Sequence, residues 1–227
     1  GNWSNEDHWT GAEGTHNTPN QAGDNATINI TESNKSATIK YDLTTLSARL
    51  GNIFLGTSGS STATLDVSGK TGPVGDNTTL NATNVTIGSL GILKLGAKDE
   101  THYGILDVSG TLTINNGGAL NFSGGTLNAT SKTATVSNSG TLAISGGATR
   151  VVNGLVTNNN GGTISVSGNN TVAEFIKDFT NKGIISMSND STMQFDAAFD
   201  NQGGSQTFEN LTINSDGYIT DTNADVF

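Results

Sequence analysis

Short runs in which apolar and small polar residues alternate recur along the whole chain. In the second half, one pattern appears four times: an apolar residue, any residue, an asparagine, a glycine-containing turn and then an alternating run. The four copies begin at Val136, Val156, Phe179 and Phe199. Alternation with a period of two is typical of β-strands that bury one face, so the pattern predicts strands and excludes helices almost everywhere.

The spacing of the asparagines gives the length of this repeat. Asn138, Asn158, Asn181 and Asn201 follow one another at intervals of 20, 23 and 20 residues. A unit of this length is too short for a strand–helix–strand crossover, but it suits two or three short strands with tight corners. The repeat therefore predicts an all-β fold, a parallel β-solenoid with about 20–23 residues per coil and about ten coils. An antiparallel sandwich is the alternative fold.

The four asparagines have two structural interpretations. In the first, each side-chain amide bonds to the next one along the axis, as an internal or corner ladder. In the second, asparagine stands at four similar corners because it tolerates a left-handed backbone conformation. The sequence leaves both interpretations open.

The first half of the chain carries a looser version of the repeat. The sequence LDVSG occurs at 65–69 and again at 106–110, each time about ten residues after a Leu-Gly pair. This correspondence places Asp66 and Asp107 at matching positions of different coils. Two stacked carboxylates are too few for a hard cation such as calcium, which needs several oxygen ligands, so we expect both to be polar residues on a wet strand face.

The first thirty residues differ from the rest because they hold both tryptophans. They contain the pattern W-x5-W-x9-P-x4-D-x-A-x-I, formed by Trp3, Trp9, Pro19, Asp24, Ala26 and Ile28. Exposed tryptophans could stack on sugars, but the end of a solenoid exposes apolar core and strand edges, which bulky rings cover well. We therefore expect residues 1–28 to be an N-terminal cap and first strand, and residues 29–227 to be coils that continue beyond this sequence.

This N-terminal pattern and the repeats that follow it resemble the start of the passenger regions of bacterial autotransporter-type and related β-helical surface proteins. The resemblance covers nearly the whole chain. It implies a right-handed parallel β-helix that is exported and displayed, so we expect the protein to be secreted or on the bacterial cell surface.

Charge and composition exclude several classes of partner. The 227 residues carry a net charge of −10 with only ten Lys and Arg, so a nucleic-acid backbone would be repelled. No apolar run approaches the roughly 18 residues that span a bilayer, so we expect no direct membrane insertion. The absence of cysteine removes disulfides, zinc thiolate sites and cysteine nucleophiles.

A polysaccharide lyase or glycoside hydrolase on a parallel β-helix is the main rival function, because fold alone does not decide activity. A hydrolase needs two converging carboxylates, whereas the adjacent acidic pairs here, Glu6-Asp7 and Asp99-Glu100, point to opposite faces if they lie on strands. His8, His16 and His102 are too dispersed for a metal site or a catalytic triad. We therefore expect no catalytic residue, no metal site and no cofactor.

The densest charged and aromatic cluster lies in a predicted corner at 98–104. Its candidate ligand-binding residues are Lys98, Asp99, Glu100, His102 and Tyr103. The matching segment of the preceding copy, 57–63, contains only small residues, so a binding function could be placed at 98–104 without disturbing the scaffold. A solvated charged loop is the alternative, and residues 70–76 form a second irregular corner of the same kind.

These observations predict an extracellular, non-enzymatic segment of an adhesin-like surface protein. It would act as a stalk or present a binding face, with host or environmental glycans or a surface protein as partners and with self-association through the solenoid ends. Enzymatic degradation of polysaccharides is the runner-up.

Overall fold

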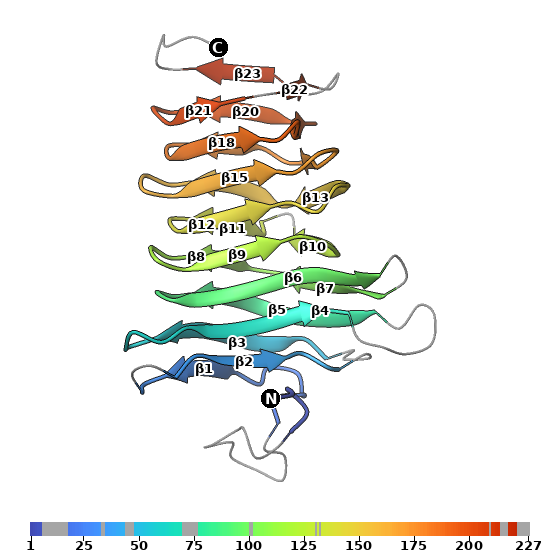
Figure 1. Cartoon of the computed structure of the whole chain (residues 1–227), viewed down its shortest axis with the longest axis vertical. Helices are drawn as coiled ribbons and strands as arrows, with labels where there is room; N and C mark the ends of the chain where they lie inside the picture. The colour runs from blue at the N-terminus through green and yellow to red at the C-terminus, as the bar shows by residue number, and fades with distance from the viewer. Residues whose placement is uncertain are drawn as a thin grey trace.

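The computed structural model describes residues 1–5, 18–32, 35–43, 48–69, 77–99, 102–129, 131, 133–208, 210–213 and 218–221. Every regular element in these residues is a β-strand, and the strands stack in parallel as successive coils. The chain rises from the N-terminus to the C-terminus as a right-handed parallel β-solenoid (Figure 1). The fold class predicted from the repeat is therefore confirmed, and the antiparallel sandwich is excluded.

Each coil contributes strands to two sheets. Sheet A stacks β2 (Ala37–Lys40), β4 (Ala63–Ser68), β6 (Gly91–Asp99), β9 (Ala119–Phe122), β12 (Thr141–Ile144), β15 (Thr163–Ser167), β18 (Ile184–Ser188) and β21 (Ser205–Thr207). Sheet B begins with β1 (Ala26–Ile30), β3 (Leu50–Thr57) and β5 (Thr78–Ile87). Above β5 it divides into two arms. The first arm holds β7 (His102–Val108), β10 (Thr126–Ala129), β13 (Thr149–Asn153), β16 (Val172–Phe175), β19 (Thr192–Phe195) and β22 (Asn210–Ile213). The second arm holds β8 (Thr111–Ile114), β11 (Thr135–Asn138), β14 (Leu155–Asn158), β17 (Phe179–Asn181), β20 (Ala198–Asn201) and β23 (Tyr218–Asp221).

Coil length differs between the two halves of the solenoid. In sheet A, Leu120, Leu142, Ile164 and Ile185 are stacked partners at intervals of 21 to 22 residues. The partners Ile39, Leu65, Leu93 and Leu120 are 26 to 28 residues apart, because the early coils have longer strands or longer connections between them. Sheet A accordingly has eight described levels, and the expectation of about ten coils was too high.

The repeat found in the sequence corresponds to the register of the second half. Val136, Val156, Phe179 and Phe199 are stacked partners in the second arm of sheet B. The residues that close the copies, Val152, Phe175 and Phe195, are stacked in the first arm. Each copy of the repeat is therefore one coil.

The two LDVSG segments do not occupy matching positions. Asp66 lies in β4 of sheet A, where its partners are Lys40 and Lys94. Asp107 lies in β7 of sheet B, and its carboxylate accepts a hydrogen bond from the Arg49 guanidinium at 3.2 Å. The two segments share a sequence because both sheets bury alternate apolar residues in the same way. The prediction that Asp66 and Asp107 stand at matching positions was therefore wrong. Likewise, segment 57–63 connects sheet B to sheet A, whereas 98–104 connects sheet A to sheet B.

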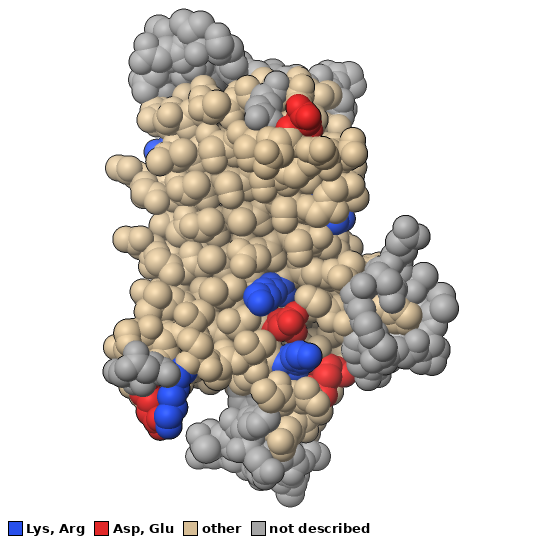
Figure 2. Space-filling view, in the orientation of Figure 1, with Lys and Arg blue, Asp and Glu red and all other residues tan. Residues whose placement is uncertain are grey.

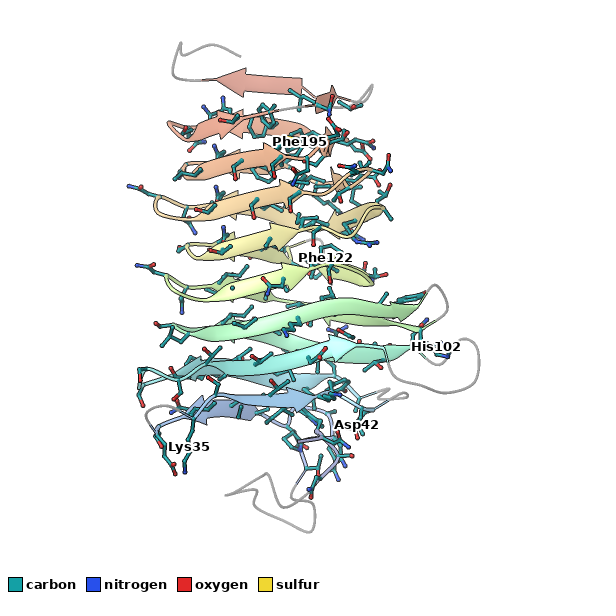
Figure 3. The ribbon with its side chains drawn as sticks, in the orientation of Figure 1. Lys35, Asp42, His102, Phe122 and Phe195 are labelled. Atoms are coloured by element: carbon teal, nitrogen blue, oxygen red, sulfur yellow. The ribbon has the colours of Figure 1, made fainter. Side chains whose placement is uncertain are left out.

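The core consists of stacked rows of buried side chains. In the second half, four phenylalanines from both arms of sheet B meet inside the solenoid, and the label of Phe195 marks this region in Figure 3. The Phe175 and Phe195 rings stack with centroids 5.5 Å apart, and the Phe179 ring contacts both edge-on. Such aromatic contacts add to the free energy gained by burial.

A ladder of asparagine side chains runs along the second arm of sheet B. The Nδ2 groups of Asn138, Asn158 and Asn181 donate to the Oδ1 atoms of the next asparagines at 2.8, 2.8 and 3.0 Å. All four side chains are buried, and none of the four residues has a positive φ. The structure thus shows an internal ladder and not a set of left-handed corners.

The ladder also holds the adjoining corners. The Nδ2 groups of Asn138 and Asn158 each donate a second hydrogen bond to a backbone oxygen just after the next corner, on Thr163 at the start of β15 and on Ile184 at the start of β18. The glycines beside these amides leave no room for a side chain, since a Cβ at Gly183 would lie 2.7 Å from Asn158 Nδ2. A glycine before the sheet A strand of each of these coils, at Gly140, Gly162, Gly183 and Gly204, is therefore a packing requirement.

Trp3 is fully buried at the N-terminal end of the core. Its indole Nε1 donates to Pro19 O at 2.9 Å, and its ring meets Tyr41 edge-on at 5.1 Å. Trp3 therefore covers the core and offers no face to a sugar. Trp9 lies outside the described residues.

Candidate functional site

One corner of the solenoid projects beyond the coil. The ends of β6 and β7 form an antiparallel pair in which Ala97 faces Tyr103 and Asp99 faces His102. The other strand pairings of the described residues are all parallel. His102 marks this projecting edge in Figure 3. The corner singled out in the sequence is thus also irregular in the structure.

The five candidate residues of this corner have different environments. The His102 side chain is only 8% exposed, so it does not present itself to a large ligand. Tyr103 is partly exposed, and its backbone N–H donates to Asn77 Oδ1 at 3.3 Å. Lys98 and Asp99 belong to β6, but their side chains, like the whole of Glu100, lie outside the described residues, as do His8, His16 and residues 70–76.

A hollow of about 520 Å³ lies directly beside Tyr103, and we call it the corner groove. It crosses the corners of three successive coils, which connect β6 to β7, β9 to β10 and β12 to β13. Its lining residues are Ala97, Tyr103, Gly125, Thr126, Gly146, Gly147, Ala148 and Arg150. The groove therefore has an aromatic wall and a cationic wall.

Glycines keep the floor of the groove free of side chains. Gly125, Gly146 and Gly147 have φ values of +79°, +107° and +68°, a backbone region that other residues rarely adopt. The next corner of the same edge carries Asn169 and Asn170 instead, both exposed. The hollow thus follows from a local run of glycine between a projecting corner and a corner with side chains.

Arg150 stands at a register position that is otherwise part of the core. Its partners in the two following coils are Ala173 and Met193, both fully buried. The guanidinium instead lies at the corner, where Nε donates to Ser145 O at 3.1 Å and Nη2 donates to Ser123 O at 2.9 Å and to Gly146 O at 3.1 Å. Burial lowers the pKa of Arg150 from its ordinary value, yet an arginine stays protonated at neutral pH. The groove therefore holds a fixed positive charge.

Two carboxylates converge on the outer face of the first arm of sheet B. Gln194 Nε2 donates to Glu174 Oε1 at 2.9 Å and to Asp196 Oδ1 at 3.0 Å. Burial, together with the hydrogen bond and the charge of Asp196, raises the pKa of Glu174. The sequence analysis missed this pair because Glu174 and Asp196 come from successive coils, and only the register of β16 and β19 brings them together.

No group of three or more His, Asp or Glu residues that could hold a metal ion occurs in the described part of the chain. The same residues contain no helix long and apolar enough to cross a membrane.

Sequence reasoning also missed Arg150 as a candidate. The signal was present in the repeat, because an alignment of the coils places a charged residue in a column of core residues.

Comparisons with protein-family models, with curated proteins and with solved structures found no match. The class that the fold defines is the parallel β-solenoid.

Proposed function

We propose that the chain is a rigid extracellular segment of a bacterial surface protein, which acts as a stalk and presents the corner groove to glycans. The observation that carries the proposal is the hollow beside Tyr103, where an aromatic ring, glycine corners and a fixed guanidinium meet. Shallow sites that combine an aromatic ring with fixed polar groups suit sugars, whose rings have apolar faces and polar edges.

The rest of the molecule supports a role as a scaffold. The asparagine ladder and the stacked phenylalanines tie the coils of the second half to one another, and in a solenoid each coil is stabilised by such contacts with its neighbours. The visible face in Figure 2 carries few charged groups, which gather towards its N-terminal half. The similarity of the N-terminal pattern to autotransporter-type passengers supports export and display at the cell surface.

A polysaccharide-degrading enzyme remains the second candidate because of Glu174 and Asp196. A carboxyl group whose pKa is raised by burial and by a neighbouring carboxylate is suited to act as a general acid. The bridging Gln194 amide, however, occupies both carboxylates at once. We therefore favour binding over hydrolysis.

A glycan array combined with product analysis on plant, algal and animal polysaccharides tests the proposal. We expect binding without shortened or unsaturated products, and we expect Tyr103→Ala to lose that binding while Tyr103→Phe keeps it. Shortened products that disappear in Glu174→Gln would establish the enzyme instead. Glycan binding that is unchanged in Tyr103→Ala would move the site away from the corner groove.

A further inference from the structure

The positive charge of Arg150 has no carboxylate partner among the described residues. Arg49 pairs with Asp107, and Lys35 pairs with Glu32. Arg150 is bound by backbone carbonyl oxygens alone, and its contact from Nη1 to Thr149 O is long at 3.4 Å. A guanidinium has five N–H donors, so at least one Nη1 donor is left for a ligand in the groove.

The contacts with backbone carbonyl oxygens hold the Arg150 guanidinium in place before any ligand binds. Nε and Nη2 are tied to the corners of two coils, those of Ser123 and Ser145. A cation held in this way loses little conformational entropy when it binds an anion. The remaining Nη1 donor can form a single charge-assisted hydrogen bond with an oxygen of a carboxylate or a sulfate.

We propose that the corner groove selects an anionic sugar unit, with its carboxylate or sulfate at Arg150 and its ring against Tyr103. This inference rests on the proposed function as a glycan binder, and it names the class of glycan. The volume of about 520 Å³ is in the range of small-molecule sites and accommodates one sugar unit. The net charge of −10 opposes a long polyanion lying along the rod, so recognition is local to one unit.

The test uses four oligosaccharide probes and three variants, in about 150 mM salt so that distant charges are screened. The probes are a galacturonan oligomer, its methyl-esterified form, a sulfated galactan oligomer and the unsubstituted galactan. Arg150→Gln removes the charge of the groove. Lys182→Gln makes the same change of net charge at an exposed residue of the opposite edge and is the matched control. Ala148→Trp fills the groove from an exposed position and leaves the carbonyl contacts of Arg150 in place.

We expect at least one anionic probe to bind about tenfold or more tightly than its neutral counterpart, as a charge-assisted hydrogen bond implies. Arg150→Gln should erase this preference, Lys182→Gln should keep it and Ala148→Trp should block binding. Preference for the galacturonan identifies a carboxylate as the ligand group, and preference for the sulfated galactan identifies a sulfate.

Three results would overturn the inference. Equal affinity of the unmodified chain for anionic and neutral probes would overturn the selection of anionic sugars, but the proposal that the chain binds glycans would stand. A preference for anions that survives in Arg150→Gln or in Ala148→Trp would place the anion site elsewhere. Failure of the chain to bind any glycan of the array or any of the four probes would overturn both proposals. A thermal melt of each variant separates loss of the site from loss of the fold.

Discussion

The side-chain amide of Asn158 donates to Asn181 Oδ1 at 2.8 Å, across 23 residues of sequence and one step of the solenoid. Asn158 also accepts from Asn138 and donates to Ile184 O, so its side chain links three coils. Because the side chain is fully buried, water does not replace any of these bonds when one partner is removed.

Asn158→Ala is therefore expected to destabilise the centre of the ladder. It leaves the Asn138 amide and the Asn181 carbonyl short of a partner, and each such group costs about 1–3 kcal/mol. Denaturant unfolding should show the loss, and hydrogen exchange should locate it in β11, β14 and β17. Asn160→Ala, two residues away and exposed, is the control and should leave both measurements unchanged. Equal effects of the two substitutions would contradict a role for the ladder in stability.

Phe195→Ala should lower the free energy of unfolding by about 3–5 kcal/mol, because it opens a cavity in a packed core. The ring is fully buried and contacts the rings of Phe175, Phe179 and Phe199. Phe54→Ala removes the same group from a strand position where the ring is 38% exposed, and its cost should be much smaller. Denaturant titration of both variants checks this difference, and a reversed order would show that the phenylalanine stack does not hold the solenoid together.

Because Tyr41 is buried, we expect the free energy of unfolding to fall at alkaline pH. Its hydroxyl is buried without a hydrogen-bond partner, and burial, with a smaller effect of the Asp42 charge, raises its pKa above the ordinary value. Because the folded state disfavours the phenolate, the stability contributed by neutral Tyr41 is full below the unfolded pKa of about 10 and falls as the pH rises beyond it.

Tyr41→Phe should flatten this alkaline decline and should be at least as stable at pH 7, since it removes an unpaired buried hydroxyl. Unfolding curves between pH 7 and 11 measure both effects. Tyr103→Phe, at a partly exposed tyrosine, should retain the decline. An alkaline decline that persists in Tyr41→Phe would assign the effect to another group.

The scaffold of the second half could be predicted from the sequence because every coil repeats the same buried columns. Val156, Asn158 and Ile164 recur with their stacked partners at almost constant spacing, so sequence period and structural register coincide. In the first half, strands and connections differ in length from coil to coil, so the similar segments LDVSG at 65–69 and 106–110 lie in different sheets.

The candidate site could be predicted only in part. Tyr103 stood out as an aromatic residue in an irregular corner, but the groove also needs Gly125 and Arg150, which belong to two later coils. Their proximity depends on the exact length of each coil, which residue patterns alone do not fix. The Glu174–Asp196 pair escaped detection for the same reason.

The most direct measurement is hydrogen–deuterium exchange of the chain with and without a glycan that it binds. We predict that protection by the ligand is centred on residues 97, 103, 125–126, 146–148 and 150, which line the corner groove, and that it is absent in Tyr103→Ala. Protection centred on β16 and β19 around Glu174, or spread evenly along one sheet, would contradict the assignment of the binding site to the corner groove.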